Sequence, residues 1–170
     1  MPSHRSPKGV YSRSSPDWFG DRTCFVGDFT DIGSTGYYTS TWFLTNNDAQ
    51  GRYFALFALS LYTDGSDATL VGYPETPAGT LVTPPRYIRL DQGQAPGKFS
   101  RLDTLVGGGN SINTDVKHII TALPSLFAGA LIEYGAPLWL LPANATMAFG
   151  SEFPAGPAAI AIWYTLLAGN

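Results

Sequence analysis

Hydrophobic and polar residues alternate along short stretches of this chain, with the period of two that is typical of β-strands. Clusters of Gly, Pro, Asn and Asp separate these stretches at intervals of roughly 8–12 residues, as in sandwiches and barrels. The pattern predicts strands over residues 23–29, 37–45, 52–62, 69–72, 80–82, 87–90, 99–106, 126–134, 138–141, 146–149 and 158–167. We therefore expect an all-β protein, a jelly roll or β-sandwich of about eight to ten short antiparallel strands.

Residues 113–123 are the one segment in which a helical period competes with the strand pattern. Four apolar residues, the first Val116 and the last Leu123, fall at i, i+3, i+4 and i+7, which predicts a short helix. A strand over residues 117–122 fits the same residues almost as well. At most one short helix is therefore expected in the chain.

The segment Asn46-Asn47-Asp48-Ala49-Gln50-Gly51 has the composition of a turn. It lies between the predicted strands over residues 37–45 and 52–62. We therefore predict that these two strands form a hairpin with a longer loop.

Two of the predicted strands are apolar on both faces. Residues 52–62 place Tyr53, Ala55, Phe57, Leu59 and Leu61 on one face and Phe54, Leu56, Ala58, Ser60 and Tyr62 on the other. Residues 158–167 place Ile160, Ile162, Tyr164 and Leu166 on one face and Ala159, Ala161, Trp163, Thr165 and Leu167 on the other. Because a strand with one wet face alternates apolar with polar residues, both strands are expected to be covered on their two sides.

Charge is scarce in the last third of the chain. Residues 118–170 contain only two ionised side chains, Glu133 and Glu152. Charged residues make up 14% of the whole chain, which is below the roughly 25% of an ordinary soluble domain. We infer that part of the surface is buried against other chains.

The first 20 residues differ from the rest, because they combine prolines and serines with basic and aromatic side chains. We predict an extended N-terminal arm over residues 1–20 and a single β-sandwich domain over residues 21–170. A terminus without fixed structure is the alternative to an arm that orders on a partner. The residues predicted to contact a partner are Arg5, Lys8, Tyr11, Arg13, Trp18 and Phe19.

Enzymatic chemistry has few candidates. The two histidines, His4 and His118, cannot supply the several ligands of a cupin-type metal centre, and no Gly-x-Ser-x-Gly elbow surrounds a serine. The acids Asp28 and Asp31, like Asp64 and Asp67, lie at turns without the ligand spacing of a calcium loop. The single Cys24 excludes an internal disulfide. We expect no cofactor, no metal and no catalytic residue.

Nucleic acid and sugars are the other candidate ligands that the sequence suggests. Pro85-Arg86-Tyr87-Ile88-Arg89 and Lys98-Phe99-Ser100-Arg101 interleave basic and aromatic residues, but the net charge of −3 argues against nucleic acid. Solvated strand faces, or salt bridges across a subunit boundary, explain these basic residues better. Tyr37, Tyr38 and Trp42 could form a sugar-stacking platform, although packing in the core is favoured. No signal peptide or membrane span is predicted, so the product is expected to be made in the cytoplasm.

Two passages of the chain resemble a known type of protein. Residues 37–64, where Leu44-Thr45-Asn46-Asn47 leads into a long apolar strand, are similar to the jelly-roll modules of tailed-phage virion proteins. The same holds for Ala136-Pro137-Leu138-Trp139-Leu140-Leu141-Pro142-Ala143-Asn144-Ala145-Thr146, and the nearest type is the capsid decoration, or cement, protein. These are strand-and-turn patterns, so no functional residue is carried over from the family.

The resemblance implies a jelly roll, commonly a homotrimer, that sits on the outside of a bacteriophage capsid and clamps adjacent copies of the major capsid protein. We therefore expect a non-enzymatic virion structural protein that binds neither membranes nor nucleic acid and is located on the capsid surface. Two alternatives remain: a receptor- or carbohydrate-binding tail module, and a small β-fold hydrolase using His118.

Overall fold

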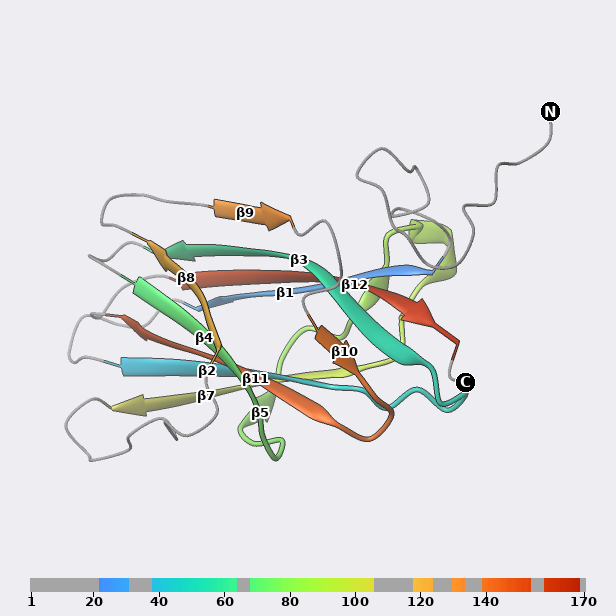
Figure 1. The fold of residues 1–170 in the computed structure, drawn as a ribbon, viewed down its shortest axis with the longest axis horizontal. Helices are drawn as coiled ribbons and strands as arrows, with labels where there is room; N and C mark the ends of the chain where they lie inside the picture. Colours follow the sequence, from blue (N-terminus) through green and yellow to red (C-terminus); the bar gives the residue numbers. More distant parts are fainter. Residues whose placement is uncertain are drawn as a thin grey trace.

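The computed structural model describes residues 22–30, 38–63, 68–105, 118–123, 130–133, 139–153 and 158–168. These residues form two antiparallel sheets that face each other, and the all-β sandwich predicted from the sequence is thereby confirmed (Figure 1). The predicted arm over residues 1–20 lies outside the described residues. Within the described part of the chain, no helix has the length and apolar character needed to cross a bilayer.

Twelve strands make up the described sheets. They are β1 (Thr23–Thr30), β2 (Tyr38–Thr45), β3 (Tyr53–Thr63), β4 (Ala68–Pro74), β5 (Thr80–Leu81), β6 (Arg86–Tyr87), β7 (Lys98–Leu105), β8 (His118–Leu123), β9 (Ala130–Glu133), β10 (Trp139–Leu141), β11 (Thr146–Phe153) and β12 (Ala158–Leu167). One sheet, called here the β12 sheet, has the order β10-β3-β12-β1-β6, and β9 also pairs with β3. The other, the β2 sheet, has the order β5-β7-β2-β11-β4-β8.

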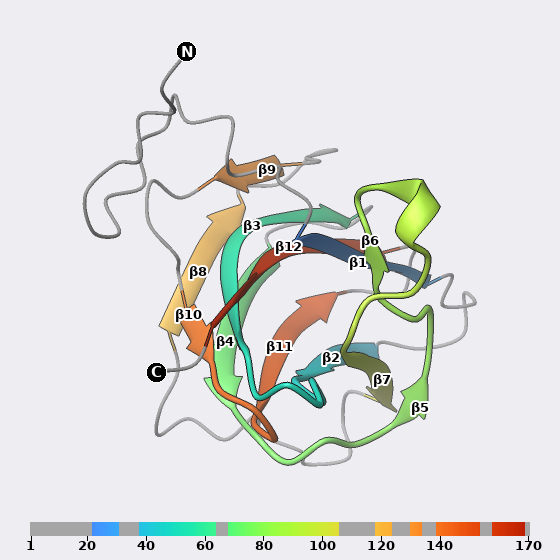
Figure 2. The same cartoon turned by 90° about the vertical axis from the view of Figure 1, so that its right-hand side faces the viewer.

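Figure 2 shows β3, β12 and β1 side by side across from β11, β2 and β7. The core lies between these two layers. Its largest fully buried side chains are Trp42, Tyr164, Phe54, Phe99 and Phe149. The rings of Phe54 and Tyr164 stack with centroids 4.5 Å apart, which adds a specific contact to the apolar burial.

The predicted helix is wrong over residues 118–123, because these residues form β8. β8 pairs with β4 at the edge of the β2 sheet, so the strand alternative is confirmed there. Its sequence HIITAL contains three β-branched residues, which favour an extended backbone. Residues 113–117 lie outside the described residues. The strand predicted over residues 87–90 is also wrong beyond Tyr87, because residues 88–89 are bends and Leu90 begins the 3₁₀ turn Leu90–Gln92.

The predicted hairpin of β2 and β3 is wrong as well, because the two strands belong to different sheets. The connection between them is a corner that crosses the sandwich. Asn46, which is fully buried, donates its side-chain amide to the carbonyl oxygens of Arg52 and Leu141 over 2.8 and 2.9 Å. Turn-forming residue types therefore mark a buried corner here rather than the tip of a hairpin.

A β-bulge in β3 corrects the predicted faces of that strand. Trp163 of β12 pairs with Ala58, but Tyr164 pairs with Leu56, so Phe57 is the extra residue. The bulge reverses the alternation, and Leu59 therefore joins Phe54 and Leu56 in the core. Residues 54–59 are all buried, as the sequence pattern predicted for both faces of this strand.

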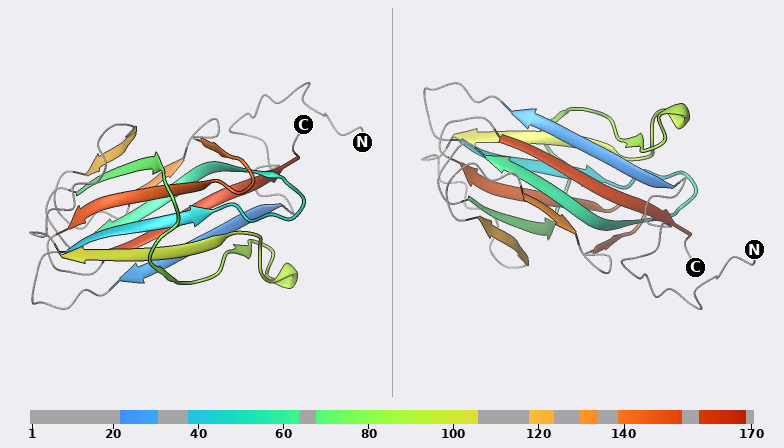
Figure 3. Two further views of the ribbon diagram at one scale, coloured as in Figure 1. Left: turned by 90° about the horizontal axis from the view of Figure 1, so that it is seen from below. Right: turned by 90° about the horizontal axis from the view of Figure 1, so that it is seen from above.

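Part of the outward face of the β2 sheet is covered by the chain itself. Residues 75–79 cross it on the way from β4 to β5, as Figure 3 shows in its left view. The hydroxyl of Ser100 donates to the carbonyl of Ala78 over 2.7 Å, and Gly79 lies so close to Arg101 that a Cβ would collide with its backbone. Phe43 and Ala148, on the same face, are 3% and 0% exposed.

Replacing Ile162 by Ala should destabilise the fold by about 2–5 kcal/mol, because it leaves a cavity at the centre of the core. Ile162 is fully buried in β12. Leu90→Ala is the matched control, since Leu90 is 87% exposed and its truncation should change the free energy of unfolding by less than about 0.5 kcal/mol. Urea denaturation measures both, and equal effects would contradict the placement of β12.

Candidate interaction surface

The outward face of the β12 sheet is the most unusual surface of the described residues. Strand register puts Phe25 beside Trp163, Gly27 beside Ala161 and Phe29 beside Ala159. The outward positions are Phe25, Gly27 and Phe29 on β1, Ala159, Ala161, Trp163, Thr165 and Leu167 on β12, Tyr53, Ala55, Ala58 and Ser60 on β3, and Leu140 on β10. We call this set the outer apolar face.

The outward positions of β1, β12, β3 and β10 carry no ionised group, but Arg86 on β6 and Glu133 on β9 are in register with Phe25 and Ala58 and so occupy outward positions at the two edges. Four positions of the outer apolar face expose large side chains. Phe29 is 61% exposed and Leu140 is 57% exposed, while Phe25 and Tyr53 are each 37% exposed. The rings of Phe25 and Trp163 lie with centroids 5.3 Å apart, so they form one continuous aromatic surface. Exposed apolar patches of this kind mark interaction sites more often than isolated hydrophobic residues do.

The predicted faces of β12 are confirmed. Ile160, Ile162, Tyr164 and Leu166 are at most 2% exposed, and the residues between them are partly exposed. This alternation leaves Trp163 and Leu167 on the outer apolar face. Arg86 pairs in register with Phe25 and marks the margin of the face at β6.

One end of the outer apolar face forms a shallow groove with a volume of about 300 Å³. Tyr53, Leu140, Leu167 and Ala168 line it, and the C-terminal end of β12 lies beside β10 (Figure 2). Two positions before Leu167 on the same face, the hydroxyl oxygen of Thr165 is buried without a hydrogen-bond partner among the described residues. A buried hydroxyl without a hydrogen-bond partner destabilises the fold unless another group forms a hydrogen bond with it.

A polar network holds β1 in the orientation that turns its phenylalanines outward. Asp28 points into the sandwich, where its carboxylate accepts hydrogen bonds from Trp42 Nε1 over 3.0 Å and from Arg101 Nη1 over 2.6 Å. Arg101 Nε also donates to Asp103, which accepts a second hydrogen bond from the Ser40 hydroxyl. The network ties β1 to β2 and β7 across the sandwich.

Arg101 remains positively charged in this network with Asp28 and Asp103. Burial lowers its pKa, but the hydrogen bond to Asp28 and the attraction of the two carboxylates outweigh burial, so the pKa is raised. The guanidinium therefore stays charged between the sheets. Its ion pairs lie within one chain, and so does the exposed pair of Arg89 and Asp91, which lie 2.6 Å apart.

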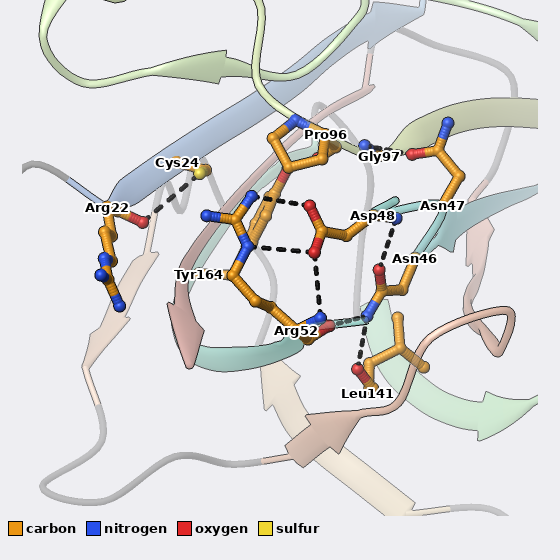
Figure 4. A network of polar contacts seen from close by, with 10 residues as sticks. All are labelled: Arg22, Cys24, Asn46, Asn47, Asp48, Arg52, Pro96, Gly97, Leu141 and Tyr164. Atoms are coloured by element: carbon orange, nitrogen blue, oxygen red, sulfur yellow. Dashed lines mark hydrogen bonds and ion pairs between the residues drawn. The ribbon is translucent and has the colours of Figure 1, made fainter. Parts of the chain in front are cut away.

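A second polar network closes the opposite corner of the core, at the connection between β2 and β3 (Figure 4). Arg52 donates to both carboxylate oxygens of Asp48, over 3.0 and 2.7 Å, and its backbone amide donates to the same carboxylate over 2.9 Å. The hydrogen bonds from Arg52 lower the pKa of Asp48, and those to Asp48 raise the pKa of Arg52. The Asp48 side chain is 3% exposed, so this is a buried ion pair.

Cys24 and Tyr164 lie next to this corner and are unsuited to catalysis (Figure 4). The Tyr164 hydroxyl donates to the carbonyl of Pro96 over 2.7 Å, and burial raises the pKa of Tyr164 well above its usual value. Burial also raises the pKa of the Cys24 thiol to about 12. A thiol in that state is a poor nucleophile, because the thiolate is the reactive form.

The residues predicted to bind a partner, Arg5, Lys8, Tyr11, Arg13, Trp18 and Phe19, all lie outside the described residues. His118 begins β8, where its backbone pairs with Gly72. The part of the chain that the structure describes contains no group of three or more His, Cys, Asp or Glu residues arranged to hold a metal ion.

The basic and aromatic segments do not form one surface. Phe99 is a core residue, Tyr87 packs against the core, and Arg101 lies between the sheets. Trp42 is also fully buried, so it cannot belong to a sugar-stacking platform. Its assignment to the core is confirmed.

Sequence reasoning missed Phe25 and Phe29 as surface residues. The signal was present, because Phe25, Gly27 and Phe29 alternate with Cys24 and Val26 along β1. Asp28 obscured it, since a carboxylate at an inward position argues against that side being the core.

No family model, curated protein or solved structure matches this chain significantly.

Asp48→Ala should lower the free energy of unfolding by about 3–5 kcal/mol near neutral pH, because it removes the carboxylate that pairs with the partly buried Arg52 guanidinium. The folded-state pKa of Asp48 lies below its usual value of 3.8, so its contribution is present above about pH 4 and is lost as the pH falls further. Asp91→Ala, which removes an exposed pair, should leave the denaturation midpoint unchanged. Similar midpoint shifts for the two variants would contradict the burial of the corner.

Cys24 should resist aromatic disulfide reagents near pH 8 in the folded protein, because its thiol is buried and remains protonated. The same thiol should react within minutes once guanidinium chloride unfolds the chain. Absorbance of the released thiolate measures both rates. Rapid labelling without denaturant would contradict the position of Cys24 in the core.

Proposed function

We propose that this chain is a non-enzymatic structural subunit of a virion, a capsid decoration protein that associates with copies of itself and clamps adjacent shell subunits. The observation that carries the proposal is the outer apolar face, in which Phe25 and Trp163 form an uncharged aromatic surface. Covering such a face with a second protein surface removes it from water and so lowers the free energy of the complex.

The proposal includes a jelly-roll topology. The strands β1, β12, β3 and β9 follow one another in the β12 sheet, while β2, β11, β4 and β8 follow one another in the β2 sheet. Successive strands alternate between the sheets at β1 to β2, β2 to β3 and β11 to β12. This alternation is expected of two Greek keys folded into a double-layered roll. β5, β6 and β7 then form an insertion that extends the edges of both sheets.

The size of the exposed surface supports association through several contacts rather than one. Full burial of one large apolar side chain contributes about 1.5–3 kcal/mol, and binding costs an estimated 4–15 kcal/mol in lost motion. The four side chains Phe25, Phe29, Tyr53 and Leu140 are 37–61% exposed, so burying the rest of them contributes roughly 3–6 kcal/mol per copy, which lies within the range of the cost of a single pairwise contact and not above it. In a closed ring each copy contacts two neighbours and so buries more apolar surface than in one pairwise contact, which favours a homo-oligomer such as a trimer.

Binding to a capsid shell also depends on several weak contacts acting together. An oligomer that presents several identical weak sites to a regular lattice of major capsid proteins binds far more tightly than one site does. A receptor- or carbohydrate-binding module is less favoured, since Trp42 of the expected platform lies in the core.

Phe29→Asp should convert the oligomer into a monomer at micromolar concentration, because a carboxylate buried in an apolar interface lacks a partner. Light scattering coupled to size-exclusion chromatography measures the mass. Leu90→Asp is the control, since Leu90 is 87% exposed on the 3₁₀ turn and is not one of the residues of the outer apolar face. A monomeric wild-type chain, or a Phe29→Asp variant of unchanged mass, would sink the self-association proposal.

The shell-binding part is tested separately by sedimenting the wild-type chain with purified phage capsids that lack a decoration protein. We expect saturable binding by the wild-type oligomer and a large loss of binding for Phe29→Asp. An oligomer that fails to bind capsids would reject the decoration role and leave the self-association result standing.

A further inference from the structure

One row of residues crosses the β12 sheet on its outward side. Strand register joins one residue from each of β6, β1, β12, β3 and β9, in the order Arg86, Phe25, Trp163, Ala58 and Glu133. Directly paired residues of antiparallel strands lie on the same face of a sheet, so all five positions belong to the outward side. The row therefore has an arginine at the β6 edge, a glutamate at the β9 edge and uncharged residues between them.

The two charged ends of the row are too far apart to pair within one copy. Neighbouring strands lie about 4.8 Å apart, so four strand spacings separate Arg86 from Glu133 by roughly 19 Å. This separation exceeds the Debye length of about 8 Å at physiological ionic strength, so the two charges interact only weakly inside one copy. Arg86 is exposed and forms no ion pair with another described residue. An acidic group of another molecule can therefore reach its guanidinium.

We propose that Arg86 of each copy pairs with Glu133 of a neighbouring copy, around a symmetry axis that runs along the strands. This pairing rests on the self-association proposed above, to which it adds the orientation of the copies. Rotation about such an axis keeps every row at one height and brings the β6 edge of one copy beside the β9 edge of the next. Each boundary then joins opposite charges at the margin of an apolar contact that covers Phe25 and Trp163.

The same charges disfavour the other simple arrangement of two faces. A two-fold axis that runs across the strands would place the β6 edges together and the β9 edges together, so each Arg86 would meet a second Arg86. Like charges placed together weaken association, whereas complementary charges at the rim of an interface mainly fix the orientation of the partners. A second copy of this chain is thus a partner whose charges fit both edges of the outer apolar face.

Charge reversal at the two ends of the row tests the pairing. Arg86→Glu and Glu133→Arg should each raise the dissociation constant of the oligomer about ten-fold or more, because each puts like charges at every boundary. The double variant Arg86→Glu/Glu133→Arg exchanges the two charges and should return the constant to within about three-fold of the wild-type value. Dilution series in the analytical ultracentrifuge measure the four constants.

Lys98→Glu is the matched control, because it makes the same change of charge at an exposed residue of the β2 sheet. It should leave the dissociation constant unchanged. Urea denaturation checks that each variant is folded. If Glu133→Arg unfolds the chain, Glu133→Gln takes its place, and its combination with Arg86→Glu should associate more tightly than Arg86→Glu alone.

An equimolar mixture of the two single charge-reversal variants adds a second expectation. The two kinds of copy alternate in a dimer, so the mixture should associate as tightly as the double variant if the wild-type protein is dimeric. A ring of three cannot alternate two kinds of copy, so the mixture should associate more weakly than the double variant if the wild-type protein is trimeric. The reverse of either result would contradict an axis along the strands.

Unchanged dissociation constants for both single variants, in a wild-type protein that self-associates, would overturn the pairing and leave the proposed association standing. A double variant that associates no more tightly than the single variants would overturn it as well. A wild-type chain that stays monomeric would reject the self-association itself, and the pairing with it.

Discussion

The pairing of β12 with β1 on one side and β3 on the other is the constraint on which the rest of the structure depends. This register sends Ile162 and Tyr164 into the core, and the same register sends Trp163 outward next to Phe25. The apolar surface is thus tied to the core, because neither set of side chains can change sides without the other. A one-residue slip would expose the core and bury the surface.

The outward faces of the two sheets are covered to different extents by other parts of the chain. Residues 75–79 cross the β2 sheet, and the apolar residues beneath them, Phe43 and Ala148, are buried by the chain's own backbone and side chains. On the β12 sheet the described residues leave Phe29 and Leu140 largely exposed. The covering of the β2 sheet is local, because Leu81 and Leu102 on its outward face are 65% and 41% exposed.

Much of the fold was predictable from local pattern, and the failures share a physical cause. The bounds of β12 follow directly from its alternation, and the two-sheet class follows from strand length and turn spacing. The hairpin prediction failed because the burial of Asn46 depends on Leu141, 95 residues away. The outward face of β1 was missed because Asp28 is neutralised by Arg101, which lies 73 residues away. Long-range partners of polar residues leave no local signal.

The bulge at Phe57 limits how this strand can vary during evolution. Before it, even-numbered positions such as Phe54 and Leu56 face the core, and after it the odd-numbered Leu59 does so. Related sequences should therefore conserve apolar residues in two sets of alternating core-facing positions, one before the bulge and one after it, that are out of phase by one residue. Loss of one residue at Phe57 would bring the two sets into phase on a regular strand without the bulge, so this is the position in β3 where a deletion keeps both sets of side chains facing the core.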